Sequence, residues 1–372
     1  MRITFWWTSV PQYPRTRIIL PLISQLMISG TKYLAMFLTA TTMMWLVTGC
    51  TDPNDASRPK PKVDPESVSI VRFDQLLCST DGSPEPSSPG YLMERYPVFS
   101  DVFFNQIIFP QNTPSIGLEK LVNQYCSAPA IRHLMDTTMT IFPDLTNFER
   151  DLGQAFGYFN HYFPDRPIPE VYSYVSEFGI GVFTVESRVL GIGLDFFLGE
   201  DYPYYDPAVF PNYMVRTMTQ EYLTAKAIEA LAQVVLPPTS TGNLLDYMIF
   251  NGKRLFISSR LLPDDPMYTL CQYSPQQMKW VEDNELNIWS YFLDLGYFYE
   301  NDPRKFKKFV DPAPTTPGLP EQAPGRVANW IGYRIVESYM KQNPQISLQE
   351  LAADRDFQSI MDGSNYKPPR PQ

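Results

Sequence analysis

Histidine is scarce in this sequence. The 372-residue chain has two, His133 and His161, and they lie far apart. A metal centre built on imidazole nitrogens needs two or three histidines at helical or strand spacing. We therefore expect no histidine-based metal site and no metal cofactor, and we interpret both residues as lying at the surface or at the edge of the core.

Cysteine is also sparse, with four residues and no CxxC spacing, so a zinc site made of thiolates is not favoured. Cys50 belongs to an N-terminal motif, which leaves Cys78, Cys126 and Cys271. Three thiols cannot all pair within one chain. Two interpretations stay open: one disulfide, with Cys78–Cys126 as the pair considered, or three buried free thiols.

The motifs of several large enzyme classes are missing. The sequence has no G-x-S-x-G elbow, no P-loop and no dinucleotide-binding fingerprint. Gly191-Ile192-Gly193 lacks a third glycine and indicates close packing within a strand. Acidic residues number 40 against 30 basic ones. Because phosphate contacts need a basic face, we expect no nucleic acid partner.

The N-terminal segment is the one region without acidic residues. Residues 1–49 carry only basic charges, and residues 33–48 are almost wholly apolar or small. A basic residue followed by a short apolar run is typical of a secretory signal, and this run is shorter than the roughly 20 residues of a spanning helix. The first 26 residues add little to such a signal, so we expect that translation begins at Met27.

The end of this signal is a lipobox, Leu46-Val47-Thr48-Gly49-Cys50. Lipoprotein processing requires a thiol at the first mature position, where a diacylglyceryl group is attached as a thioether. We predict a signal peptide at 1–49 and lipidation of Cys50, with anchoring in the cell envelope. The alternative is a membrane-anchoring helix that happens to contain a cysteine.

The composition divides the rest of the chain into a tether, a globular domain and a tail. Prolines at 53, 59, 61 and 65 block helix and strand, which predicts a flexible tether over residues 50–66. We expect one globular domain at 67–363 and a polar tail at 364–372. Without the signal, 26 basic residues face 40 acidic ones, which gives the mature chain a net charge of about −14.

The hydrophobic periodicity predicts an α+β fold that is mainly helical, with a small sheet in mid-chain. Apolar alternation indicates an extended segment at 68–73 and strands at 170–178, 181–186 and 189–197, the last two joined by a tight hairpin at 186–188. Helical spacing predicts the remaining elements at 117–125, 128–140, 146–163, 213–235, 242–252, 275–299, 303–309, 326–342 and 347–354, with 91–109 partly helical. Ser347 and Glu350 form a predicted capping box.

A sheet followed by a long helix is the layout of zincin metallopeptidases, whose helix carries H-E-x-x-H. Here the frame reads Gln220-Glu221-Tyr222-Leu223-Thr224, with Asn251 at the position of the third ligand. Neutral amide and hydroxyl groups are weak zinc ligands, so a zincin scaffold would be one without metal. The other interpretation is that Gln220 and Thr224 are polar residues of a helix that never bound metal.

Two further hypotheses concern binding and hydrolysis. In the first, an extended peptide adds to strand 189–197 beside the zincin-like frame. In the second, Glu221, Asp195 and Asp246 are the acids of an envelope hydrolase acting on peptide or peptidoglycan. A weaker hypothesis assigns the aromatic loop 199–213 to carbohydrate contacts, although core packing explains such residues more often.

Several short segments, in order along the chain, resemble the gliding motility lipoprotein GldB family of Bacteroidota. They include Arg72-Phe73-Asp74, residues 192–199, Leu244-Leu245-Asp246, Gly252-Lys253, Trp330-Ile331-Gly332 and residues 364–368. The family is linked to gliding and the type IX secretion machinery, and it is distantly similar to zinc proteases that keep HExxH.

The lipobox, the flexible tether and the missing ligands favour a non-enzymatic lipoprotein that binds partners in the cell envelope. The resemblance implies that these partners are envelope proteins of the gliding and secretion machinery, and we expect the lipid anchor in the outer membrane, on its periplasmic or surface face. By this resemblance, the frame at Gln220–Thr224 is that of a pseudo-peptidase. No catalytic residue of the zinc proteases can be assigned to this chain.

Overall fold

The computed structural model describes residues 3–6, 61–78, 88–110, 117–238 and 242–369. Contacts between Cα atoms divide the chain into two compact units, one made of Met1–Ser9 with Lys60–Gln372 and the other of Val10–Pro59. Every element below belongs to the first unit. The predicted lipobox lies outside the described residues, and among those that are described no helix is long and apolar enough to cross a membrane.

A mixed sheet of five strands, in the order β1-β4-β5-β3-β2, occupies the middle of this unit. Its strands are β1 (Ile3–Trp6), β2 (Ile70–Arg72), β3 (Glu170–Tyr174), β4 (Val182–Val185) and β5 (Val189–Gly193). The hairpin between β4 and β5 is confirmed, and Glu186 adopts the left-handed φ of 51° that the tight turn requires. β2, β3 and β5 run parallel.

The structure corrects three details of the predicted sheet. The strand expected at 170–178 ends at Tyr174. The strand expected at 189–197 ends at Gly193, and Leu194–Phe197 forms a 3-10 turn, η2. In addition, β5 lies between β4 and β3. Both of its edges are therefore paired, so the predicted addition of a peptide to this strand is wrong.

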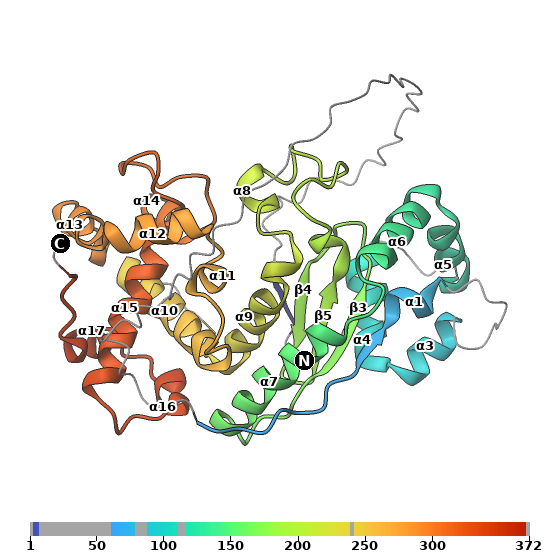
Figure 1. Cartoon of the computed structure of the whole chain (residues 1–372), viewed down its shortest axis with the longest axis horizontal. Coiled ribbons are helices and arrows are strands. Elements are labelled where there is room, and N and C mark those ends of the chain that lie inside the picture. Colours follow the sequence, from blue (N-terminus) through green and yellow to red (C-terminus); the bar gives the residue numbers. More distant parts are fainter. Residues whose placement is uncertain (1–2, 7–60, 79–87, 111–116, 239–241, 370–372) are drawn as a thin grey trace, which may run out of the picture. The chain divides into compact units, whose positions relative to one another are not determined.

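Both faces of the sheet are buried, which explains the nearly continuous apolar character of its strands. One face packs against α1 (Phe73–Leu77) and α4 (Pro97–Val102), where the ring of Phe99 stacks on that of Tyr172 with 4.3 Å between centroids. The other face packs against α7 (Thr146–Tyr162) and α9 (Leu223–Val235). Figure 1 shows these helices around β3, β4 and β5.

Helices at the N-terminal side of the sheet match the predicted segments closely. They are α3 (Pro89–Arg95), the π-helix η1 (Phe103–Ile108), α5 (Leu118–Ser127) and α6 (Pro129–Ile141). Proline is the first residue of α3, α4 and α6, where its missing N–H costs nothing. The segment 91–109, predicted as partly helical, is helical in three short pieces.

The C-terminal half is helical, as predicted. Its elements are α10 (Leu244–Leu261), α11 (Met267–Cys271), α12 (Pro275–Asp283), α13 (Glu285–Asp294), η4 (Tyr297–Tyr299), α14 (Pro303–Val310), α15 (Val327–Gln342), α16 (Leu348–Ala353) and α17 (Phe357–Ser364). The Ser347–Glu350 capping box is confirmed. The helix predicted at 275–299 is three elements, because the chain departs from helical geometry at Asn284 and Gly296.

Candidate functional site

The zincin-like frame does not lie on one continuous helix. The helix predicted over 213–235 is instead α8 (Asn212–Val215), the 3-10 turn η3 (Gln220–Tyr222) and α9. Gln220 therefore belongs to η3, whereas Thr224 belongs to the first turn of α9. A metal-binding pair at i and i+4 needs both residues on one face of an α-helix, and this local geometry does not provide that.

Lys226 explains part of this break. Its ammonium group is buried and donates hydrogen bonds to the backbone oxygen of Thr217 at 2.6 Å and to Thr217 Oγ1 at 3.0 Å. Desolvation lowers the pKa of Lys226 well below its usual value. A side chain from the second turn of α9 thus fixes the bend before η3, and Thr217 takes part in this bend rather than in a helix.

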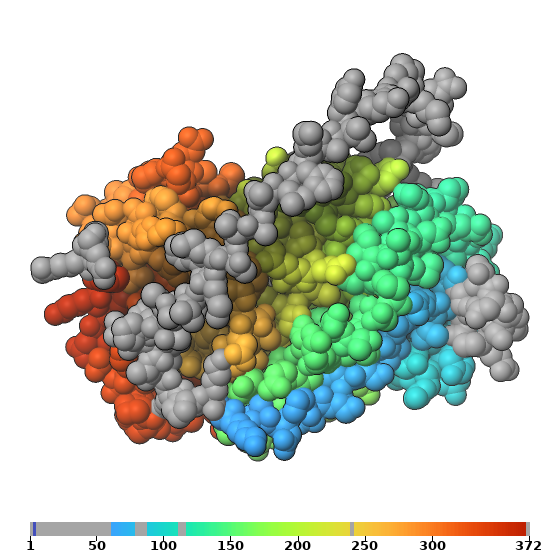
Figure 2. All heavy atoms as spheres, in the orientation of Figure 1, coloured from blue at the N-terminus to red at the C-terminus, as the bar shows by residue number. Residues whose placement is uncertain are grey.

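The two leading residues of the frame make separate contacts at the surface. Gln220 is exposed, and its Nε2 donates to the backbone oxygen of Ile141 at 3.3 Å. Glu221 is exposed as well, and its Oε1 accepts from the hydroxyl of Tyr268 at 2.6 Å. That hydrogen bond raises the pKa of Tyr268. Figure 2 shows the surface hollowed between the green helices and the orange ones, with yellow-green residues in the floor.

Asn251 lies in a different environment. It is buried in α10, and its Nδ2 donates to Asn329 Oδ1 of α15 at 2.9 Å. Asn329 in turn donates to the backbone oxygen of Val310 at the end of α14 at 3.0 Å. The amide that stands at the third ligand position therefore joins three helices. Nowhere in the described part of the chain do three or more His, Cys, Asp or Glu side chains gather closely enough to hold a metal.

A buried group of polar and charged side chains connects α9, α10 and the end of α11. Arg254 Nε lies 3.1 Å from Glu229 Oε1, and Gln272 also donates to Glu229. Beside them is a cavity of about 10 Å³, lined in part by Cys271, Tyr273, Arg326 and Trp330. These side chains therefore join the helices, and the cavity beside them has room for about one water molecule.

Lys226, Glu229 and Arg254 were not predicted from the sequence as site residues. The sequence does indicate that Lys226 and Glu229 are buried, because α9 is apolar on nearly all sides and a helix of that kind lies in the interior. Charged residues within such a helix need partners in the interior. This reasoning selects Lys226 and Glu229 from the sequence, although it does not give their partners.

Asp195 is the most enclosed of the suspected acids. It is fully buried, and its Oδ2 accepts from the backbone N–H of Ser176 at 3.0 Å and of Phe178 at 2.7 Å. Glu177 and Phe178 have left-handed φ values of 54° and 58°. Burial raises the pKa of Asp195 to about 6, against the lowering effect of these hydrogen bonds. The carboxylate thus holds the loop after β3 in a strained conformation.

Asp246 has an ordinary structural role. Its Oδ2 accepts from the backbone N–H of Asn243 at 2.9 Å, while Asn243 Oδ1 accepts from the backbone N–H of Asp246 at 3.0 Å. This is the capping box of α10. Glu221, Asp195 and Asp246 therefore make hydrogen bonds with three separate sets of partners.

The aromatic loop at 199–213 is used mostly for packing. Tyr205 and Phe210 are buried, and the Tyr205 hydroxyl donates to the backbone oxygen of Asp195 at 2.9 Å. Phe178 contacts the rings of both residues. Tyr204 is the exposed member, with 47% of its surface accessible, and it contacts His133.

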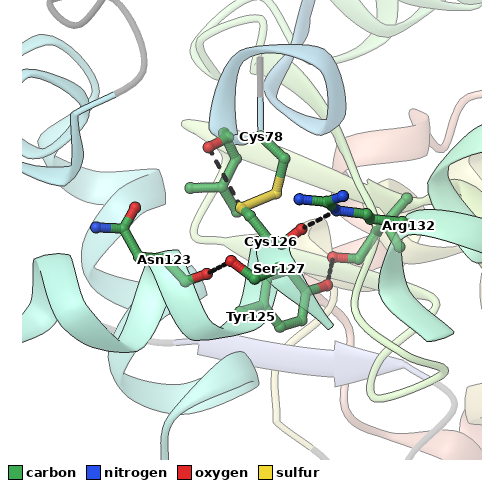
Figure 3. The surroundings of a disulfide bond; sticks show 8 residues. Cys78, Asn123, Tyr125, Cys126, Ser127 and Arg132 are labelled. Carbon is green, nitrogen blue, oxygen red and sulfur yellow. Dashed lines mark hydrogen bonds between the residues drawn. A yellow bond between two sulfur atoms is a disulfide. The ribbon is translucent and has the colours of Figure 1, made fainter. Parts of the chain in front are cut away.

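The disulfide interpretation is confirmed for Cys78 and Cys126, which are bonded with 5.4 Å between their Cα atoms. Figure 3 shows the bond between the end of α1 and the last turn of α5. Arg132 Nε donates to the backbone oxygen of Cys126 at 3.2 Å. Cys271 is free and buried, and desolvation raises the pKa of its thiol. A stable disulfide is typical of proteins outside the reducing cytosol.

These features define a mainly helical α+β protein whose interior charges connect its helices and whose N-terminal helices are joined by a disulfide. The chain belongs to the family of the gliding motility protein GldB, whose model matches residues 55–368. Membership implies a lipoprotein of the cell envelope and a role in gliding motility. No curated protein and no solved structure matches the chain.

Proposed function

We propose that this protein is anchored through lipid on Cys50, in the outer membrane, and acts without catalysis as a partner of other envelope proteins in gliding and the associated secretion machinery. Three features support the proposal. The matched family is a lipoprotein family, the sequence carries a lipobox five residues before the match begins, and a disulfide joins α1 to α5. The flexible, proline-rich tether predicted at 50–66 would give the domain reach from the bilayer.

The proposal that the protein acts without catalysis rests on the hydrogen bonding of the zincin-like frame. Gln220 bonds to α6, Glu221 to α11 and Asn251 to α15, so each side chain already has a structural partner. We infer that the frame is that of a pseudo-peptidase. An envelope hydrolase of zincin descent is the alternative, and no contact among Glu221, Asp195 and Asp246 favours it.

Lipidation is tested on the protein in its own host. We expect the mass of the N-terminal peptide from the membrane fraction to equal that of a chain beginning at Cys50 with a diacylglyceryl group. Cys50→Ser abolishes this modification and releases the protein from the membrane, whereas Cys271→Ser, which changes a buried free thiol, does not. A membrane-bound chain that retains residues upstream of Cys50 would contradict the proposal.

The hydrolase alternative has its own measurement. Metal analysis of the purified protein together with peptidase and peptidoglycan hydrolase assays is expected to give no stoichiometric zinc and no turnover. Zinc at one equivalent, with hydrolysis that Glu221→Gln abolishes, would overturn the non-enzymatic assignment.

A further inference from the structure

The two edges of the sheet have different neighbours. At the β2 edge, the backbone N–H of Ile70 donates to Glu149 Oε1 at 2.9 Å, so a side chain of α7 covers that edge. At the other edge, β4 pairs with β1, and Ile3, Thr4, Phe5 and Trp6 lie opposite Val185, Thr184, Phe183 and Val182. The second edge therefore receives an added strand.

The backbone direction of β4 identifies the groups that hold this added strand. The oxygen of Gly181 accepts from Gly193 and that of Val185 accepts from Arg188, so the odd-numbered residues direct their backbone groups toward β5. Successive residues of a strand alternate in this respect. The backbone groups of Val182 and Thr184 consequently face outward, toward Trp6 and Thr4 respectively.

β4 has none of the features that protect a free edge. Its sequence, Val-Phe-Thr-Val, contains no charge and no proline, and all four residues are buried with β1 in place. Natural edge strands are usually protected by lysine, proline or a bulge. Ile3 is partly buried and packs against the cluster that includes Phe183 and Val185. Both the backbone and the side chains of this edge thus fit an extended apolar segment.

The segment that fills the edge lies upstream of Cys50. Under the proposed processing, on which this inference rests, the mature lipoprotein lacks residues 1–49, and the outer edge of β4 loses its partner strand. We propose that this edge is the docking site for an extended strand of a partner protein, which adds antiparallel to β4 in the place of residues 3–6.

The register defines the chemistry of the partner strand. The positions opposite Val185 and Phe183 adjoin the apolar cluster, as Ile3 does, so they require aliphatic or aromatic residues two apart. The positions opposite Thr184 and Val182 need a free backbone N–H, and they adjoin the other buried face of the sheet, where Val182 belongs to the large core cluster. A short, mostly apolar strand without proline at the latter positions satisfies both conditions.

The test uses the processed protein purified from the envelope, with its N-terminus established by mass spectrometry, and the decapeptide of residues 1–10 as the probe. Fluorescence anisotropy of the labelled peptide is expected to show saturable binding. Thr184→Pro removes an outward N–H while leaving the β5 pairing, and it should weaken binding at least tenfold. Thr184→Val keeps the N–H and loses a buried hydroxyl that has no hydrogen-bond partner among the described residues, so binding should change less than twofold.

A second arm leaves the protein unchanged. A peptide with Thr4→Pro should bind at least tenfold more weakly than a peptide with Thr4→Val, because position 4 donates to the β4 edge. If the processed protein binds neither peptide, or binds the proline and valine peptides equally, the docking site is overturned while the lipid anchor stands. If the purified protein retains residues 1–49, the proposed processing and the docking site both fail.

Discussion

Asp195 places an ionisable group in the interior where solvent does not reach. Because its pKa is raised from 3.8 to about 6, the unfolded state ionises first as pH rises. Both states hold the proton below about pH 3, and the folded state is penalised progressively between about pH 3 and pH 7, most steeply between the two pKa values. This single group should therefore lower the free energy of unfolding by roughly 3 kcal/mol across that window.

Asp195→Asn tests this titration, because the amide does not ionise and its oxygen can still accept from Ser176 and Phe178. We expect the difference between wild-type and variant stability, measured by urea unfolding, to change between pH 4 and 6 and to be flat from pH 7 to 8. At pH 7, Asp195→Ala should be about 2 kcal/mol or more less stable than Asp195→Asn, since both N–H groups lose their acceptor. A pH-independent difference would refute the assignment.

The contact between α10 and α15 depends on two glycines. A Cβ at Gly332 would lie 1.8 Å from the backbone oxygen of Met248, and one at Gly252 would lie 2.2 Å from the backbone of Gly332. Gly332→Ala forces the helices apart and should cost about 3 kcal/mol or more in the free energy of unfolding. Gly90→Ala in α3 is the control, because nothing lies within 4 Å of its added Cβ. Equal urea midpoints for the two variants would contradict this packing.

The disulfide connects α1 to α5 across 48 residues of sequence. By loop-closure entropy, its reduction should lower the free energy of unfolding by about 4 kcal/mol or somewhat less. Chemical denaturation with and without reductant measures this loss, and the same loss is expected in Cys271→Ala. No effect of reductant on either protein would show that the bond contributes nothing to stability.

Elements with a strong local signal could be predicted from the sequence, and those set by distant contacts could not. α7, α15 and the hairpin of β4 and β5 follow from periodicity and turn chemistry. The break before α9 depends on Lys226 reaching back to Thr217, a contact that no residue pattern reveals. The interior position of β5 likewise depends on its pairing with β3 from an earlier part of the chain.

The candidate site shows the same division. Placing Glu221 and Thr224 in one frame required a continuous helix, and the structure has a 3-10 turn followed by a helix instead. Asp195 and Asp246 were identified as notable acids, but their hydrogen bonds to a loop and to a helix cap arise from tertiary structure and local capping respectively. The residue types of these two acids identified them from the sequence. Their structural roles became clear only from their hydrogen-bond partners.

At the scale of the whole molecule, polar side chains in the interior join its helices and loops. Arg254 of α10 pairs with Glu229 of α9, and Asp195 holds the loop after β3. Family membership places this domain in gliding motility at the cell envelope. The proposed function accordingly rests on the lipid anchor and on surface contacts, above all at β4.

Gliding of cells that depend on this protein tests the central claim most directly. The spreading rate of a strain lacking the protein is measured after complementation with wild type, Cys50→Ser or Glu221→Gln, at matched protein levels. We expect Glu221→Gln to restore spreading to the wild-type rate and Cys50→Ser to leave it at the rate of the strain without the protein. Loss of spreading with Glu221→Gln, together with full rescue by Cys50→Ser, would contradict the claim.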